Sequence, residues 1–241
     1  MSRVLLEICV DDLAGVRSAV EGGADRIELC SALALGGLSP SPAFAAAALD
    51  RGPLVHAMVR PRAGDFVYSA DELALIITEI RELIAVGVAG VVVGATQKDG
   101  SPDGESLARL RDAAVGIEIV LHRAIDLAPD PCAAVELACS LGFDHVLSSG
   151  GARSAVEGAA ILSKMVDAAA GRLNVMGGSG VTADNVADLV RSTRVDAVHA
   201  SASVLDSWPD RRIATFGFGP PVRRTTDAQR VAALRSALVK I

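Results

Sequence analysis

Eight short apolar runs alternate with amphipathic or alanine-rich runs along the 241 residues of the chain. Short runs of Val, Leu, Ile and Ala are typical of parallel strands covered on both faces, and the runs between them have helical spacing. The predicted strands are 5–9, 26–30, 54–60, 90–95, 117–124, 145–149, 173–177 and 197–201; the predicted helices between them are 12–21, 42–49, 71–86, 105–114, 131–141, 154–170 and 182–192. This alternation predicts a closed (β/α)8 barrel, a TIM-like fold.

The competing architecture is an open, doubly wound sheet. Such a sheet usually has fewer strands and a glycine fingerprint after its first strand, where this chain has Val10-Asp11-Asp12. We therefore expect residues 1–241 to form a single barrel domain. The segment 204–226, before a last helix at 227–239, has no periodicity and contains three prolines and the sole tryptophan, Trp208. An irregular segment of this length is more often functional or interfacial than idle.

Composition and charge exclude several classes of partner. The net charge of −6 argues against nucleic acid. The apolar runs are too short for a membrane helix, and no secretory leader is expected before the first strand. Four cysteines at irregular spacing do not form a disulfide framework. We expect a cytoplasmic protein with neither nucleic acid nor membrane as a partner.

Two strands near the N-terminus repeat one pattern: Glu7 and Cys9 lie two residues apart in the first, and Glu28 and Cys30 in the second. Alternate residues of a strand share a face, so each Glu and Cys should point inward together. A carboxylate and a thiol are costly in a sealed core, so a polar barrel mouth is their expected place.

Further polar side chains are predicted at the carboxyl ends of the strands, where barrel enzymes have their active sites. They are His56, Met58, Arg60, Arg62 and Asp65 at the third strand, His122, Arg123 and Asp126 at the fifth, and His199 at the eighth. His145 begins its strand and should lie at the opposite end. Structural roles compete for several of these residues, because a strand histidine is often a core residue and Arg60 and Arg62, paired with Asp65, could form an ion-pair cluster.

The first functional hypothesis is a soft-metal site. Two inward thiols on adjacent strands, Cys9 and Cys30, with Met58 as a third sulfur, suit copper(I). Cys132 and Cys139 lie seven residues apart on a helix and are interpreted as inert thiols.

The second hypothesis is an enzyme or sensor for a small phosphorylated or carboxylated ligand. The stretch Gly177-Gly178-Ser179-Gly180, leading into a helix predicted to begin at Thr182, resembles the phosphate site common in barrels. The anion would also meet three cations, Arg60, Arg62 and Arg123. Acid/base chemistry would fall to five residues, Glu7, Glu28, His122, Asp126 and His199. None of the three lysines ends a strand, which excludes a Schiff-base mechanism. A barrel that only binds or assembles is a third alternative.

Several of these motifs resemble one family in order along the chain. They are Leu5-Leu6-Glu7-Ile8-Cys9, Gly23-Ala24-Asp25-Arg26-Ile27-Glu28-Leu29-Cys30, Gly36-Gly37-Leu38-Ser39-Pro40-Ser41, Arg60-Pro61-Arg62-Ala63-Gly64-Asp65-Phe66-Val67-Tyr68, His122-Arg123-Ala124-Ile125-Asp126 and Val198-His199. The chain is similar to the copper homeostasis protein CutC family. The resemblance implies a cytoplasmic TIM-like barrel, a homo-oligomer (dimer or higher), and copper(I) binding at the cysteines that match here, Cys9 and Cys30. The chain departs from the family pattern at Ala63, where glycine is common, and in a shorter segment before its last helix.

Overall fold

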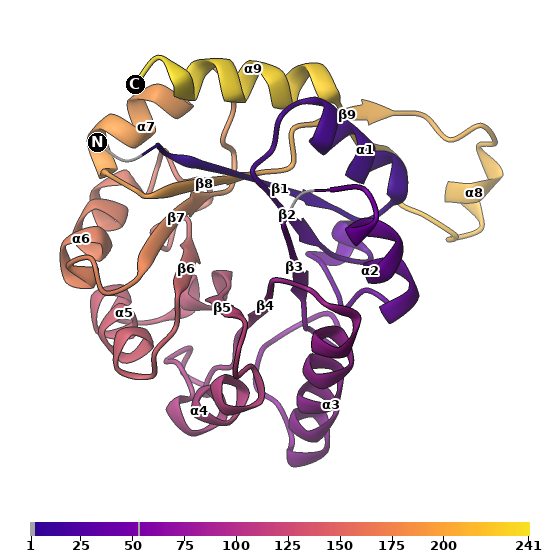
Figure 1. Cartoon of the computed structure of the whole chain (residues 1–241). Coiled ribbons are helices and arrows are strands. Elements are labelled where there is room, and N and C mark those ends of the chain that lie inside the picture. The colour runs from indigo at the N-terminus through magenta and orange to yellow at the C-terminus, as the bar shows by residue number, and fades with distance from the viewer. Residues whose placement is uncertain (1–2, 53) are drawn as a thin grey trace.

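The computed structural model describes residues 3–52 and 54–241, and its centre is a closed parallel barrel (Figure 1). The barrel strands, in order around the ring, are β1 (Leu5–Val10), β2 (Arg26–Leu29), β3 (Leu54–Met58), β4 (Gly90–Val93), β5 (Glu118–Leu121), β6 (His145–Ser148), β7 (Asn174–Gly178) and β8 (Ala197–Ala200). β1 pairs with both β2 and β8, which closes the ring. The predicted (β/α)8 fold is confirmed.

Helices surround this ring in Figure 1. They are α1 (Leu13–Glu21), α2 (Pro42–Leu49), α3 (Ala70–Val86), α4 (Gly104–Ala113), α5 (Pro131–Ser140), α6 (Ala159–Ala169), α7 (Val186–Thr193) and α9 (Ala228–Val239). Two 3-10 turns, η1 (Leu33–Leu35) and η2 (Arg123–Leu127), follow β2 and β5 at the carboxyl end of the barrel. Side-chain caps fix many helix starts; at α3, Ser69 and Glu72 form a complete capping box.

Two predicted helix starts are wrong, and the strands predicted to end at residues 60, 95 and 124 end at Met58, Val93 and Leu121. The helix predicted from residue 154 begins at Ala159, because the Ser154 hydroxyl accepts from the Glu157 amide and closes a separate turn. The helix predicted from Thr182 begins at Val186, because the Thr182 amide donates to the side chain of Asn185 instead. β5 stops at Leu121, and residues 123–127 continue as η2.

The strands separate two apolar layers. Leu6, Ile8 and Val10 of β1 face outward and join the large core between barrel and helices. The opposite faces of the strands enclose a smaller apolar cluster inside the barrel: Cys30, Met58, Val92, Val120, Leu147, Met176 and Ala197. The barrel interior also holds all four histidines of the chain, each of them buried.

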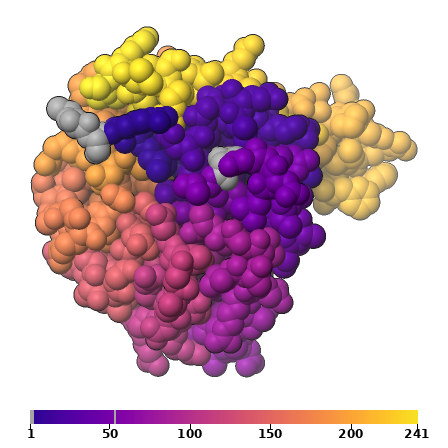
Figure 2. Space-filling view, viewed as in Figure 1, coloured from indigo at the N-terminus to yellow at the C-terminus, as the bar shows by residue number. Residues whose placement is uncertain are grey.

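The segment predicted to be irregular forms an arm that projects from the barrel beside α1 (Figures 1 and 2). It contains an antiparallel pair, β9 (Ser203–Asp206) and β10 (Arg223–Thr226), with the short helix α8 (Arg212–Thr215) between them. The sole tryptophan holds the arm together, since Trp208 Nε1 donates to the Pro220 carbonyl over 2.7 Å. Its two strands were not predicted. None of the helices in the described residues is long and apolar enough to cross a membrane.

Candidate metal centre

The register of β1 and β2 determines how the two Glu-x-Cys repeats meet. Glu7, Cys9, Glu28 and Cys30 all point inward, as predicted, but all four are buried, and Glu7 and Cys30 have no exposed surface. The strands are staggered, so that Arg26 lies opposite Glu7 and Glu28 lies opposite Cys9. The repeats are therefore offset by one inward position, as expected in a barrel whose strands are sheared.

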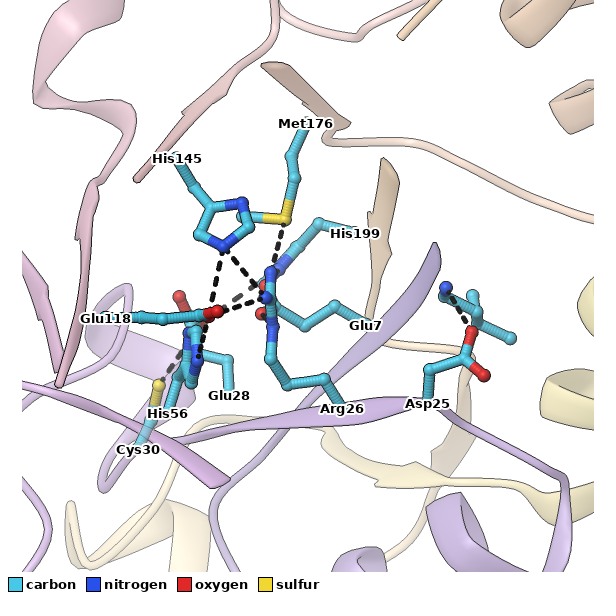
Figure 3. Close-up of polar contacts among 11 residues, drawn as sticks. Glu7, Asp25, Arg26, Glu28, Cys30, His56, Glu118, His145, Met176 and His199 are labelled. Atoms are coloured by element: carbon cyan, nitrogen blue, oxygen red, sulfur yellow. Dashed lines mark hydrogen bonds and ion pairs between the residues drawn. The ribbon is translucent and has the colours of Figure 1, made fainter. Parts of the chain in front are cut away.

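Arg26 organises the deepest polar layer of the barrel (Figure 3). Its Nε donates to Glu7 Oε2 over 2.5 Å, and its Nη2 lies 3.0 Å from the sulfur of Met176. Its Nη1 lies 3.5 Å from a carboxylate oxygen of Glu118. Sequence reasoning missed Arg26 and Glu118. Arg26 lies two residues before Glu28, and Glu118 lies four residues before His122, so each shares the inward face of its strand with a predicted site residue. This even spacing could have identified them.

His56 lies in this deep layer and not at the mouth, where it was predicted. Its Nε2 is 3.0 Å from Glu118 Oε2, and the Nε2 of His145 approaches the same oxygen at 3.1 Å. Burial lowers the pKa of His56 below its ordinary value. Hydrogen bonds from His145 and His56 hold the pKa of Glu118 well below the usual range. These residues form a structural polar layer beneath the mouth.

His199 connects the deep layer to the mouth. Its Nδ1 lies 2.7 Å from Glu7 Oε1, and its Nε2 faces Glu28, 3.8 Å from Oε2. Burial alone would raise the pKa of Glu7, but the hydrogen bond from His199 and the charge of Arg26 hold it well below its ordinary value. Burial opposes a charged His199, yet the neighbouring Glu28 raises its pKa well above the ordinary value. Burial raises the pKa of Glu28.

Above His199 lies a cavity of about 180 Å³, lined by Cys9, Glu28, Met58, Arg60, His122 and His199 among others. Three buried polar atoms of these side chains have no hydrogen-bond partner in the described residues: Glu28 Oε1, Arg60 Nε and His122 Nε2. Buried polar groups are normally satisfied, so this grouping makes the cavity the candidate position for a ligand. Cys9, Glu28 and His199 also offer three ligand atoms within 4.8 Å of one another.

The three predicted sulfur ligands lie at the same end of the barrel. Cys9 and Met58 line the cavity, whereas Cys30 lies behind it, fully buried, with its thiol donating to Glu28 Oε2 over 3.4 Å. Burial and then the nearby carboxylate raise the pKa of Cys30 well above its ordinary value. A Cβ at Gly37 would lie 3.1 Å from Cys30 Sγ and 3.7 Å from Met58 Cε, so the loop after β2 covers both sulfurs.

The predicted anion-binding cations already have protein partners. The Arg60 guanidinium donates to the carbonyls of Leu35, Gly37 and Gly64, which ties the loop after β2 to the loop after β3. Arg62 pairs with Asp65, as the structural alternative anticipated, and also with Glu72, which was not predicted. Arg60, the other cation of that predicted cluster, contacts carbonyls and not Asp65. Of these cations, Arg60 and Arg123 line the cavity.

Arg123 pairs with Asp126 over 2.7 Å, and Asp126 also accepts from Ser148 Oγ and from the amides of Ser149 and Gly151. The Asp126 carboxylate therefore joins η2 to the loop after β6.

The predicted glycine-rich anion loop lies apart from the cavity lining. Gly177 faces the helices, where a Cβ would meet Leu189 and Val195. Ser179 has a φ of 79° and donates its hydroxyl to the Arg153 carbonyl, while Gly180 is exposed. The amides of these residues do not lead directly into α7, because that helix begins at Val186.

Comparison with known proteins identifies the family. The sequence model of the CutC family matches residues 4–204. A CutC family protein of Sinorhizobium medicae is 47% identical over 99% of this chain and 97% of its own length. The chain belongs to the CutC family. A Caenorhabditis elegans relative, named copper homeostasis protein cutC homolog, is 38% identical over 99% of this chain and 97% of its own length.

The CutC fold is also found among solved structures. The crystal structure of CutC from Streptococcus agalactiae has a TM-score of 0.78 and 29% identity, covering 82% of this chain and 98% of that one. Thiamine phosphate pyrophosphorylase from Pyrococcus furiosus, at 15% identity and a TM-score of 0.63, shares the fold alone. The family match ends at residue 204, so most of the arm and α9 lie beyond it. The deep polar layer and the cavity lie within the CutC match.

Proposed function

We propose that this CutC family member binds copper(I) in the cytosol through the sulfurs of Cys9 and Cys30, with Met58 as a third ligand. Copper(I) is a soft ion that prefers thiolate and thioether sulfur. A 38% identical relative carries copper homeostasis in its name, which favours copper as the cargo. Cys9 and Cys30 are free cysteines, as a cytosolic metal-binding role requires.

The observation that carries this proposal is the convergence of three sulfurs at one end of the barrel. Cys9 and Met58 line the cavity, and Cys30 lies against Gly37 of the loop after β2. A thiol must lose its proton before it binds copper. At Cys30, copper therefore competes with a proton that is held more tightly than usual, because burial raises the pKa of this thiol. Copper affinity should therefore increase as the pH rises.

The test is a titration of copper(I) against a competing chelator under anaerobic, reducing conditions. The Cys9→Ser, Cys30→Ser double variant should lose the tight site, because both thiolates are removed. The matched control is the Cys132→Ser, Cys139→Ser double variant, which removes two half-exposed thiols of α5 and should bind like the wild type. Equal, weak affinity in the wild type and the Cys9/Cys30 variant would rule out the copper site.

A second candidate is an enzyme or sensor for a small phosphorylated or carboxylated ligand. It is favoured by Arg60 and Arg123 on the cavity wall, beside the unpartnered His122 Nε2. Glu7, Glu28, His122, Asp126 and His199 would be its acid/base residues, and Gly177 to Gly180 a further anion contact. Crystals grown with phosphate test this candidate. An anion bound in the cavity or at the glycine loop would support this candidate. The absence of an anion from both positions at high phosphate concentration would contradict it.

We also infer that the chain forms a homo-oligomer, dimer or higher. The arm exposes Leu205, Phe216 and Phe218 on an element of only two strands, which has little core of its own. Light scattering on the wild type and on the Phe216→Ser, Phe218→Ser variant tests this inference. A monomeric wild type contradicts it.

A further inference from the structure

We propose that the barrel mouth holds a second metal site, formed by Cys9, Glu28 and His199 and suited to a borderline divalent cation of the zinc class. It shares Cys9 with the proposed copper(I) site, but its other ligands come from different residues. The two sites can therefore be tested and can fail separately.

The first argument is the geometry of the three donors. Cys9 Sγ, one Glu28 oxygen and one His199 nitrogen lie within 4.8 Å of one another, and all three residues are buried. Glu28 lies opposite Cys9 in the register of β1 and β2, while His199 is the neighbour of Glu7 in β8. Three adjacent strands thus aim one ligand each at a common point. A thiolate, a carboxylate and an imidazole are the three ligand types that zinc takes in proteins.

The second argument is that Glu28 has a carboxylate oxygen with no protein partner. Its Oε2 accepts from the Cys30 thiol, but its Oε1 is buried in the cavity wall without a hydrogen bond in the described residues. The residue is 3% exposed, so solvent does not readily satisfy this oxygen. An unpaired buried carboxylate oxygen is costly, and a cation bound there would remove the cost.

The third argument is the support behind His199. Its Nδ1 can only donate to the Glu7 carboxylate at 2.7 Å, which leaves Nε2 as the atom that faces Glu28. Metal-binding histidines almost always carry such a carboxylate on the other nitrogen, because it fixes the ring and raises its basicity. Glu7 is in turn held by Arg26, which neutralises its charge.

Ligand type separates this site from the copper site. The Cys9 sulfur, a Glu28 oxygen and a His199 nitrogen form a mixed donor set that suits a borderline dication, whereas copper(I) prefers sulfur ligands. Arg60 and Arg123 also line the cavity and are excluded as ligands, since both are cationic and pair with protein oxygens. His122 lines the cavity too, but it is not part of the group whose ligand atoms lie within 4.8 Å of one another. The site would have three protein ligands and a fourth coordination position that faces the cavity. Zinc sites that keep an open coordination position have this arrangement.

The experiment uses Zn²⁺ and Co²⁺ with the full-length protein in a Cys132→Ser, Cys139→Ser background, so that the only thiols are in the barrel. Zn²⁺ affinity is measured by competition with a chromophoric chelator. Co²⁺ reports its ligands directly, because a cobalt–thiolate bond gives a charge-transfer absorption. The variants are Glu28→Gln and His199→Asn, which remove one ligand each, and Glu7→Gln, which weakens the support of His199 without removing a ligand. Because Glu7→Gln also leaves Arg26 without its anion, its folding is checked by circular dichroism. Cys30→Ser and Met58→Leu are the matched controls.

We expect one Zn²⁺ per chain and a cobalt–thiolate absorption. Glu28→Gln and His199→Asn should weaken Zn²⁺ binding more than Glu7→Gln, which should cost roughly 10–100-fold. His199→Asn and Glu7→Gln should keep copper(I) affinity and Glu28→Gln should not weaken it, because all three sulfurs remain. Cys30→Ser should weaken copper(I) binding and leave Zn²⁺ binding unchanged. Absence of the cobalt–thiolate absorption in the folded background protein overturns the proposal without relying on any variant. So does Zn²⁺ affinity that is equal in the background protein and in a folded Glu28→Gln variant.

Discussion

Arg26 and Glu7 form an ion pair inside the barrel, with 2.5 Å between Nε and Oε2 and almost no exposure of either side chain. The second oxygen of Glu7 lies against His199 Nδ1. One carboxylate therefore links the deep polar layer, formed around Arg26, to the residues of the mouth. The position and protonation of His199 depend on this pair.

Replacement of Arg26 by methionine should destabilise the fold strongly. The change leaves Glu7 buried without its cation, and breaking one side of a buried pair costs roughly 3–5 kcal/mol. Urea unfolding followed by circular dichroism measures the free energy of unfolding. The Arg26→Met, Glu7→Gln double variant should recover much of the loss, because no unpaired charge remains. A loss below about 1 kcal/mol in the single variant would show that the pair is not buried as described.

His122 should make the protein sensitive to acid. Burial lowers the pKa of His122 from 6.5 to about 4, and its Nδ1 accepts from the Ala124 amide in the neutral form. Between about pH 6.5 and 4 the unfolded chain binds a proton at this residue that the folded chain does not. The free energy of unfolding should therefore decrease as the pH is lowered from about 6.5 to 4, by an amount on the order of 3 kcal/mol in total. Buried His56, whose pKa is also lowered, acts in the same direction.

The matched variant for this prediction is His122→Asn, which keeps an acceptor near the Ala124 amide but does not titrate. Unfolding free energies of both proteins are compared from pH 7 to pH 4. His199 has a raised pKa and contributes the opposite slope only above about pH 6.5, and its contribution cancels in the comparison because it is present in both proteins. Parallel pH profiles would show that His122 is not held neutral.

The sequence predicted the fold and the inward face of the first two strands, but not the alignment of neighbouring strands. Alternation of polar and apolar residues determines which face Glu7 and Cys9 share. It does not determine the stagger between β1 and β2, which depends on closure of the whole ring. The two Glu-x-Cys repeats therefore looked equivalent in sequence, whereas the structure sets Glu28 beside Cys9 and Arg26 beside Glu7.

The residues that sequence reasoning missed lie at the other ends of the strands. Arg26 and Glu118 begin β2 and β5. The candidate residues were predicted at the carboxyl ends of the strands, so these two were not among them. His56 was placed at the mouth for the same reason, although it lies opposite Gly90 and packs toward Glu118. The arm was missed because its short strands and prolines give no periodic signal.

Gly94 should be intolerant of a side chain. A Cβ at this residue would lie 2.2 Å from His122 Cε1 and 2.5 Å from its Nδ1, so the ring would have to leave the Ala124 amide. Gly94→Ala should cost about 1–3 kcal/mol of unfolding free energy, as overpacked cores do. Gly104→Ala is the control, because a Cβ at that residue of α4 would make only ordinary contacts with Leu137. Similar stabilities for the two variants would contradict the packing of His122.

The four thiols should react with a modifying reagent in the order of their burial. Cys132 and Cys139 on α5 are partly exposed and should be modified first. Cys9, at 8% exposure, should follow slowly through the cavity. Cys30 should react only when the chain unfolds, because it is fully buried and its pKa is raised well above the ordinary value, which keeps it a thiol. Peptide mapping by mass spectrometry after timed alkylation gives each rate.

The same measurement distinguishes the two proposed metal sites. Zn²⁺ should protect Cys9 from alkylation and leave the slow rate of Cys30 unchanged, since only Cys9 belongs to its ligand set. Copper(I) should protect Cys9 and also suppress labelling of Cys30 in mild denaturant, because it engages both sulfurs. Modification of Cys30 at the rate of Cys132 in the native, metal-free protein would contradict the burial on which both expectations depend. Because the two ions share Cys9 as a ligand, they should exclude one another, and loading with one should slow uptake of the other.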